Sequence, residues 1–448
     1  MSPHVAQHAA RRVAPRPVRI AAAVLAAALP VSAVAVNLAG DSSPVASASP
    51  APAAPATGAA VINPAFATLA EATADTYVPE DEAGWRVGVY DSNGNRYSRM
   101  EELKVYSPAM DRDIPIVTIR AKEDAENAPT IYLLNGADGG TGRANWLQQT
   151  SAIDFYGERI GNVNVVIPMA GAFSYYTDWQ EPSVFDTDGN GNGGVQKWET
   201  FLTQELPGVM ESEHLQTSSD KRAIIGMSMS ASSVLVYAEQ YPDLYDSVAS
   251  YSGCASTSGS PANSVDAVFA AKGSQVTYEQ MWGDRNGDIA LRNDAQLNVG
   301  KLANRENNIY ISSATGLMGE HDVPSGDRLN GNPVGSITPA VEGGPIEAGA
   351  NVCTHAFRAA AETAGVTGIT FNFRNVGTHQ WGYWQDDMFE SWPTLARGLG
   401  LDEDQARATS EQAAADYLAA NPGIGNDGSL PWLNRTLAAA QTEDEEAE

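Results

Sequence analysis

The stretch RAIIGMSMSASS, residues 222–233, constrains the fold of this chain more than any other. An apolar, β-prone run ends at Gly226, Ser228 follows it, and small residues then lead into a helix-compatible segment through Tyr241. This order predicts a strand, a sharp turn and a helix.

The turn itself is similar to the nucleophile elbow, in which a serine on a strained turn is lifted above a parallel sheet. The second glycine usual in that motif is Ser230 here, so the local pattern is G-x-S-x-S. Glycine and serine also occupy ordinary turns. The five residues alone therefore leave a reactive serine and a plain turn as equal alternatives.

Other apolar runs predict the sheet to which this strand belongs. Alternating runs at residues 87–90, 103–107 and 114–120 favour antiparallel strands at a sheet edge. Helical stretches separate six further runs, which predict buried strands at residues 130–134, 163–168, 222–225, 247–251, 308–312 and 369–373. Strands that alternate with helices imply a mostly parallel sheet with helices on both faces, which is the α/β-hydrolase fold.

The composition admits a large core and excludes one class of partner. The chain has 448 residues, of which 43% are hydrophobic, and a formal net charge of -28. Such an acidic surface repels phosphate backbones, so we predict no nucleic-acid partner.

The N-terminus predicts export. Four arginines between residues 11 and 19 precede an Ala-rich apolar run at 20–36, and small residues follow it. Pro30 interrupts the run, which is shorter than the roughly 20 residues of a membrane span. We therefore expect a signal peptide, cleaved near Ala35 or Ala48, and a protein that is secreted or peripherally associated with the cell envelope.

These features divide the chain into four parts. Residues 1–48 form the signal peptide, and residues 49–84 form a spacer rich in proline and alanine. The α/β-hydrolase domain covers residues 85–400. An acidic C-terminal extension, residues 401–448, ends in TEDEEAE.

Ser228 needs a histidine to take its proton, and that histidine needs an orienting carboxylate. In α/β-hydrolases the histidine lies on the loop after the last strand. His379 has this place, because it follows the predicted strand 369–373 in the loop RNVGTHQ. His355 lies within a predicted helix, and His321 comes too soon after the preceding strand.

The carboxylate partner stays open at this level of argument. Five acidic residues follow the predicted strand at 308–312, and most of them must be ordinary surface charges: Glu320, Asp322, Asp327, Glu342 and Glu347. General hydrolase topology favours the nearer ones.

An oxyanion hole needs two backbone N–H groups directed at the developing negative charge. Met229, directly after the serine, is the first candidate. The second lies in LLNGADGG, residues 133–140, whose glycines allow the backbone to approach a ligand closely. The alternative for this loop is a merely flexible turn.

Six motifs in a fixed order make the chain resemble the mycolyltransferases of the antigen 85 type, and among them the corynebacterial branch. The similarity spans roughly residues 105–399. The motifs are YLLNG (132–136), YTDW (176–179), KWETFLT (197–203), GMSMS (226–230), MWG (281–283) and FNF followed by GTHQWGYW (377–384).

The resemblance implies a Ser-Glu-His triad. Counting back from FNF puts the glutamate at Glu347, with Glu342 as the alternative. It also implies oxyanion donors at the N–H groups of Ala137 and Met229, and a tryptophan of the site at Trp381. Antigen 85 proteins carry an aspartate and an arginine that hold trehalose, and Asn135 and Asp138 stand at those positions here.

The resemblance implies a serine acyltransferase that moves mycolyl groups between trehalose glycolipids, or onto another envelope acceptor, through an acyl-serine intermediate. We expect no cofactor and no metal. The alternatives are a secreted carboxylesterase and a non-catalytic envelope-binding protein. The oligomeric state is left open.

Two features lie outside this scheme. Cys254 and Cys353 are the only cysteines, and an even pair in an exported chain predicts a disulfide, with two free thiols as the alternative. The segment from Asp186 begins like a calcium loop, but Lys197 stands at its twelfth position. We therefore expect a mobile surface loop there.

Overall fold

The computed structural model describes residues 60–421, except 64, 76, 79–82, 186–193, 272–275, 304, 306–307 and 325–336. The predicted signal peptide, residues 49–59 of the spacer, the start of the possible calcium loop and the chain after residue 421 lie outside these residues. All the described residues fall within one unit, residues 54–448.

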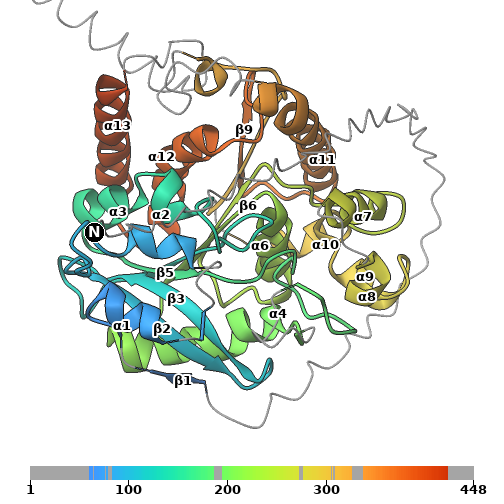
Figure 1. The fold of residues 1–448 in the computed structure, drawn as a ribbon. Coiled ribbons are helices and arrows are strands. Elements are labelled where there is room, and N and C mark those ends of the chain that lie inside the picture. Colours follow the sequence, from blue (N-terminus) through green and yellow to red (C-terminus); the bar gives the residue numbers. More distant parts are fainter. Residues whose placement is uncertain are drawn as a thin grey trace, which may run out of the picture. The chain divides into compact units, whose positions relative to one another are not determined.

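Nine strands of the described chain form one sheet in the order β1-β2-β3-β5-β4-β6-β7-β8-β9 (Figure 1). Their bounds are β1 Val61–Ile62, β2 Met100–Ser107, β3 Arg112–Ile119, β4 Thr130–Leu133, β5 Asn164–Pro168, β6 Arg222–Met227, β7 Ser247–Tyr251, β8 Ile309–Ala314 and β9 Ile369–Arg374. The pairs β1/β2, β2/β3 and β3/β5 are antiparallel, and the remaining pairs are parallel. This mostly parallel sheet confirms the α/β-hydrolase prediction, and all eight strands predicted between residues 103 and 373 occur.

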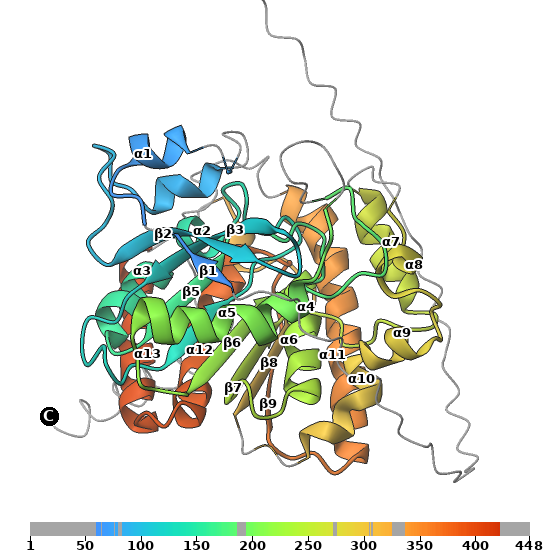
Figure 2. The ribbon, with the colours of Figure 1, turned by 90° about the horizontal axis from the view of Figure 1, so that it is seen from below.

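Helices cover both faces of the sheet. Figures 1 and 2 show α12 and α13 on one face and α6 and α11 on the other. The helices are α1 Leu69–Ala74, α2 Trp146–Gln149, α3 Ala152–Asp154, α4 Trp198–Thr200, α5 Leu206–Gly208, α6 Met229–Gln240, α7 Ala262–Ala271, α8 Tyr278–Trp282, α9 Asp288–Arg292, α10 Ala295–Asn298, α11 Gly344–Thr363, α12 Trp381–Gly398 and α13 Glu403–Ala420. None of the described helices is long and apolar enough to cross a membrane.

Successive side chains of the buried strands enter two different cores, because they point to opposite faces of a sheet. Ile131 and Leu133 of β4 pack in the core beneath α12, whereas Tyr132 packs in the core beneath α6. Both sides of each central strand are therefore apolar, as the continuous apolar runs in the sequence require.

Two details of the prediction are wrong. The alternating run at 87–90 is not a strand, because a 3₁₀ turn covers Gly84–Gly88. There the buried Arg86 forms an ion pair of 2.6 Å with Glu102 of β2, and this tertiary contact outweighs the local alternation.

The predicted domain limits at residues 85 and 400 are too narrow. β1 pairs with β2 at the sheet edge, and α13 lies in the stretch assigned to the extension, where Ala413 and Ala414 are buried in the core beneath α12. A strand of two residues gives no periodic signal that a sequence could reveal.

Candidate active site

Ser228 occupies a strained turn between β6 and α6. Its φ of 53° lies in the left-handed region, which is uncommon for a residue other than glycine. The turn is tight, because a Cβ atom on Gly226 would lie 2.5 Å from the carbonyl oxygen of Ser230. Ser228 is thereby held beyond the end of its strand.

Ser230 has a definite structural part in this turn. Its buried hydroxyl accepts a hydrogen bond from the Met227 N–H at 2.9 Å and donates to the Met227 carbonyl at 3.0 Å. The serine that stands in place of the usual second glycine therefore closes the turn with its side chain.

A continuous chain of hydrogen bonds joins Ser228, His379 and Glu347. His379 Nε2 lies 2.8 Å from Ser228 Oγ, and His379 Nδ1 lies 2.8 Å from Glu347 Oε2. These residues come from the β6–α6 turn, the loop after β9 and the first turn of α11. The structure thus brings together three side chains that lie far apart in the sequence.

Glu347 is held independently of the histidine. Its side chain is almost fully buried, and Oε1 accepts hydrogen bonds from Ser252 Oγ at 2.9 Å and from the Ala314 N–H at 2.7 Å. The alternative carboxylate, Glu342, is exposed. Glu347 is therefore the acid whose position suits an orienting role.

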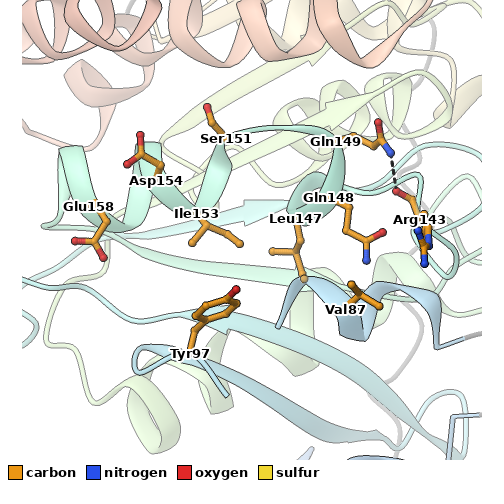
Figure 3. A pocket seen from close by; sticks show the side chains of 11 residues that line it. Val87, Tyr97, Arg143, Leu147, Gln148, Gln149, Ser151, Ile153, Asp154 and Glu158 are labelled. Carbon is orange, nitrogen blue, oxygen red and sulfur yellow. Dashed lines mark hydrogen bonds between the residues drawn. The ribbon is translucent and has the colours of Figure 1, made fainter. Parts of the chain in front are cut away.

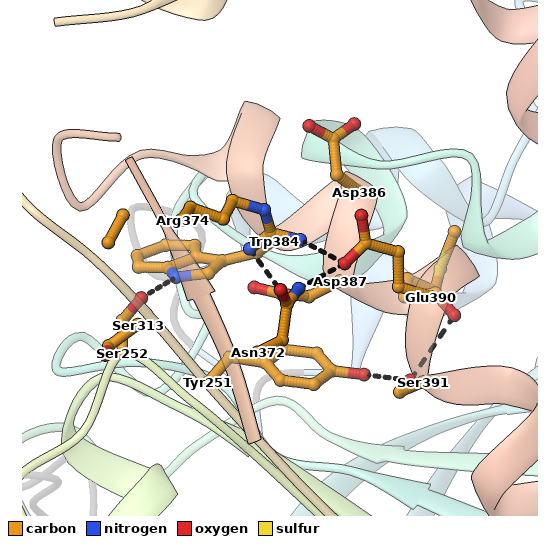
Figure 4. Close-up of polar contacts among 12 residues, drawn as sticks. Tyr251, Ser252, Ser313, Asn372, Arg374, Trp384, Asp386, Asp387, Glu390 and Ser391 are labelled. Carbon is orange, nitrogen blue, oxygen red and sulfur yellow. Dashed lines mark hydrogen bonds and ion pairs between the residues drawn. The ribbon is translucent and has the colours of Figure 1, made fainter. Parts of the chain in front are cut away.

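Aromatic side chains surround the histidine. Trp384 packs edge-on against His379 with 5.1 Å between ring centroids, and its indole N–H donates to Ser252 Oγ at 3.1 Å (Figure 4). Trp381, one turn earlier in α12, is half-buried and packs against Trp384 and Trp146. The sequence prediction included Trp381 but missed Ser252 and Trp384; Trp384 belongs to the GTHQWGYW motif, whereas Ser252 carries no sequence signal.

A buried aspartate holds the loop that carries His379. Thr378 Oγ1 donates to Asp322 Oδ1 at 2.5 Å, and the Tyr383 hydroxyl donates to Asp322 Oδ2 at 2.6 Å. His379 has a φ of 54°, so its backbone also needs such support. Asp322, one of the five candidate acids, thus supports the histidine loop and makes no contact with the imidazole of His379 among the printed hydrogen bonds.

The two predicted oxyanion donors flank the serine turn. Met229 opens α6, and Ala137 lies in the loop after β4. In the described part of the chain neither N–H donates to a protein acceptor, so both are available to a bound oxyanion.

The predicted sugar contacts fare differently from each other. Asn135 is fully buried and donates to the Pro168 carbonyl at 2.9 Å, so it supports the loop from beneath and cannot touch a substrate. Its assignment as a substrate contact is wrong for this reason. Asp138 is half-buried and accepts a hydrogen bond from the Gly140 N–H.

A disulfide joins Cys254 and Cys353, with 5.0 Å between their Cα atoms. It links the loop after β7, which carries Ser252, to the helix that carries Glu347. The other histidines have structural surroundings: His355 is exposed on α11 and stacks on Phe373, and His321 is buried.

A buried ionic network lies between β9 and α12 (Figure 4). Arg374 forms ion pairs with Asp387 at 2.7 Å and with Glu390 at 2.9 Å, and the side chains are almost completely enclosed. Burial raises the pKa of both carboxyl groups, whereas the charge of Arg374 opposes that rise. The network ties the last strand to the helix that follows His379.

A surface pocket of about 660 Å³ lies beside α2 and α3 (Figure 3). Tyr97, Leu147 and Gln148 are among its lining residues, and none of the three hydrogen-bonded residues described above lines it.

The comparisons with known proteins agree with this geometry. The family model described as "Putative esterase" matches residues 107–395. The diacylglycerol acyltransferase/mycolyltransferase Ag85A of Mycobacterium tuberculosis (strain ATCC 25618 / H37Rv) is 30% identical over 304 residues, which cover 67% of this chain and 82% of that protein. The corresponding Ag85B of Mycobacterium leprae (strain TN) is 29% identical over 302 residues, 67% of this chain and 84% of that one. The crystal structure of Mycobacterium tuberculosis MPT51 (FbpC1) shares the fold, with a TM-score of 0.52 and 22% identity over 68% of this chain and 99% of that one.

Proposed function

Because this chain belongs to the esterase family, as a mycolyltransferase of the antigen 85 type, we propose that it is an exported serine acyltransferase. Its substrates are trehalose mycolates or other envelope glycolipids, and its product is a mycolyl ester of a second envelope hydroxyl. The observation that supports this most is the hydrogen-bonded chain Ser228–His379–Glu347 at the places where the family resemblance requires it.

In the first half-reaction, Ser228 Oγ attacks the carbonyl carbon of the donor ester while His379 Nε2 accepts its proton. Glu347 stabilises the imidazolium that forms and keeps the ring in the required tautomer. The N–H groups of Ala137 and Met229 stabilise the oxyanion of the tetrahedral intermediate. When the intermediate collapses, His379 returns the proton to the departing sugar oxygen, and the acyl group remains on the serine.

The second half-reaction reverses these roles. A hydroxyl of the acceptor gives its proton to His379 and attacks the acyl-serine, and the ester passes to the acceptor. Trp381 and Asp138 are the proposed contacts with the sugar, because both are partly accessible.

A carboxylesterase is the second candidate, since the matching family model is described as an esterase. The residues and steps are the same, except that water takes the place of the acceptor hydroxyl. Incubating the purified protein with trehalose monomycolate separates the two: the proposal predicts mainly dimycolate, and mainly free mycolate would overturn it in favour of the esterase.

The nucleophile has its own test. Ser228→Ala is expected to lower kcat by about 10⁴-fold or more with the fold intact, because the attacking atom is lost. Ser212→Ala, at an exposed serine, is the matched control and should keep full activity. Normal turnover by Ser228→Ala would refute the assignment, and failure of an active-site phosphonate to label the wild type would favour a non-catalytic envelope-binding protein.

A further inference from the structure

One imidazole and two carboxylates meet behind the histidine loop. His321 and Glu320 belong to the 3₁₀ turn Glu320–Asp322, and Asp386 lies in α12. One ligating atom of each residue lies within 4.8 Å of those of the other two. Only 1% of each of these side chains is exposed, so the group is closed to solvent. We call these three residues the buried cluster.

The buried cluster is separate from the proposed catalytic chain but packs against the helix that follows it. A Cβ atom on Gly382, in the first turn of α12, would lie 2.3 Å from Cγ of His321. The ring of His321 also packs edge-on against Tyr383, with 4.9 Å between centroids. The glycine therefore makes room for an imidazole that has no part in the proposed acyl transfer.

The charge of the buried cluster is not balanced by its own members. Glu320 and Asp386 are both carboxylates, and His321 can supply at most one positive charge. Arg374 pairs with Asp387 and Glu390, which use its charge on the other side of α12. An excess of buried negative charge is costly unless a cation or a proton neutralises it.

Asp386 points to a missing partner. Its Oδ2 lies 2.8 Å from His321 Nε2, but its enclosed Oδ1 has no hydrogen-bond partner among the described residues. Figure 4 shows the Asp386 carboxylate directed away from the network around Arg374. A buried carboxylate oxygen of this kind normally accepts a hydrogen bond or binds a cation.

The distances suit a metal ion of small radius. His321 Nε2 is 2.8 Å from Asp386 Oδ2 and 3.8 Å from Glu320 Oε1. Ligands at the roughly 2.0–2.2 Å that zinc requires are about 3 to 4 Å apart, so an ion fits between these atoms after small side-chain movements. A neutral imidazole with two carboxylates suits zinc, whereas calcium and magnesium prefer oxygen ligands alone.

We propose that Glu320, His321 and Asp386 form a buried structural zinc site. The ion balances the charge of the buried cluster and fastens the 3₁₀ turn to the first turns of α12. Asp322, the next residue after His321, holds Thr378 beside the proposed catalytic base. The site therefore stiffens the histidine loop without touching substrate.

Metal content tests the proposal without any substrate, so its outcome is independent of the proposed acyl transfer. The full-length exported protein, purified without a histidine tag, is equilibrated with zinc, dialysed and analysed by mass spectrometry for metals. We expect about one zinc per chain in the wild type and a clear loss in Asp386→Asn and His321→Gln. His355→Gln, which removes an exposed histidine, is the matched control and should keep its zinc.

A chelator titration covers the case in which the variants do not fold. Removal of a bound ion lowers the Tm of the wild type, because the ion binds only the folded state. Asp386→Asn, where it folds, should show no such shift. A folded wild type that holds no zinc and whose Tm ignores the chelator would overturn the proposal and leave protons as the neutralising species. Zinc retained by both cluster variants would also overturn it, because the ion would then lie elsewhere.

Discussion

Replacing both disulfide cysteines by serine is expected to destabilise the protein mainly through its unfolded state. The Cys254–Cys353 bond closes a loop with a sequence separation of 99 residues. In the chain-entropy account, releasing a loop of that length returns about 4.7 kcal/mol of conformational freedom to the unfolded chain. Both cysteines are half-buried, so the loss of packing in the folded state is small by comparison.

Urea unfolding at 25 °C measures this effect. We expect Cys254→Ser/Cys353→Ser to lose about 4 to 5 kcal/mol of unfolding free energy, a large part of the roughly 5–15 kcal/mol typical of folded domains. The m value should rise, because the released chain exposes more surface on unfolding. Wild type unfolded under reducing conditions is the matched control and should fall on the same curve.

Two results would refute the reasoning in different ways. A loss below about 1.5 kcal/mol with an unchanged m value would show that the unfolded chain gains little from release. A collapse of kcat in a variant that is still folded would show that the disulfide positions the proposed acid. We expect kcat within about tenfold of wild type, because Glu347 keeps its hydrogen bonds from Ser252 and Ala314.

Two further predictions concern buried polar groups. Thr378→Val removes the hydroxyl that donates to Asp322 and should lower kcat by about tenfold to a hundredfold at unchanged KM, whereas Thr378→Ser should restore it; normal kcat in the valine variant would contradict the support role. Burial raises the pKa of Glu239 well above its ordinary 4.5, although Lys301 opposes this, so the wild type loses stability as the pH rises above 4.5 towards the folded-state pKa. Glu239→Gln should therefore gain unfolding free energy relative to wild type between pH 5 and 8, and parallel pH profiles in urea would refute this.

Much of the fold follows from local patterns. The continuous apolar runs predict the parallel strands because both faces of those strands are covered, as Ile131 and Tyr132 illustrate by entering different cores. The segment around Arg86 could not be predicted, since its 3₁₀ turn depends on an ion pair with a residue of another strand. Sequence alternation carries no information about such a partner.

The candidate site divides in the same way. Ser228 and His379 stand at places that strand order and turn chemistry mark in the sequence, and the geometry brings them together. The acid could be selected only by family resemblance, because what distinguishes Glu347 from Glu342 is burial beside Ser252 and the end of β8. Asn135 misled for the opposite reason, since its place next to the oxyanion loop does not reveal that its side chain turns inward.

The strained backbone of the site explains why so many supports converge on it. Ser228, Ser252 and His379 all have φ between 52° and 54°, and they follow β6, β7 and β9 at the carboxyl ends of neighbouring strands or in the loop beyond. Each such conformation costs roughly 1–3 kcal/mol and persists only where its surroundings over-determine it. The Ser230 hydroxyl, the disulfide beside Ser252 and the Asp322 network each fasten one of these three positions from outside the reacting atoms. The proposed zinc ion extends the third support, so the rigidity of the loop that carries the base rests on groups that no substrate touches.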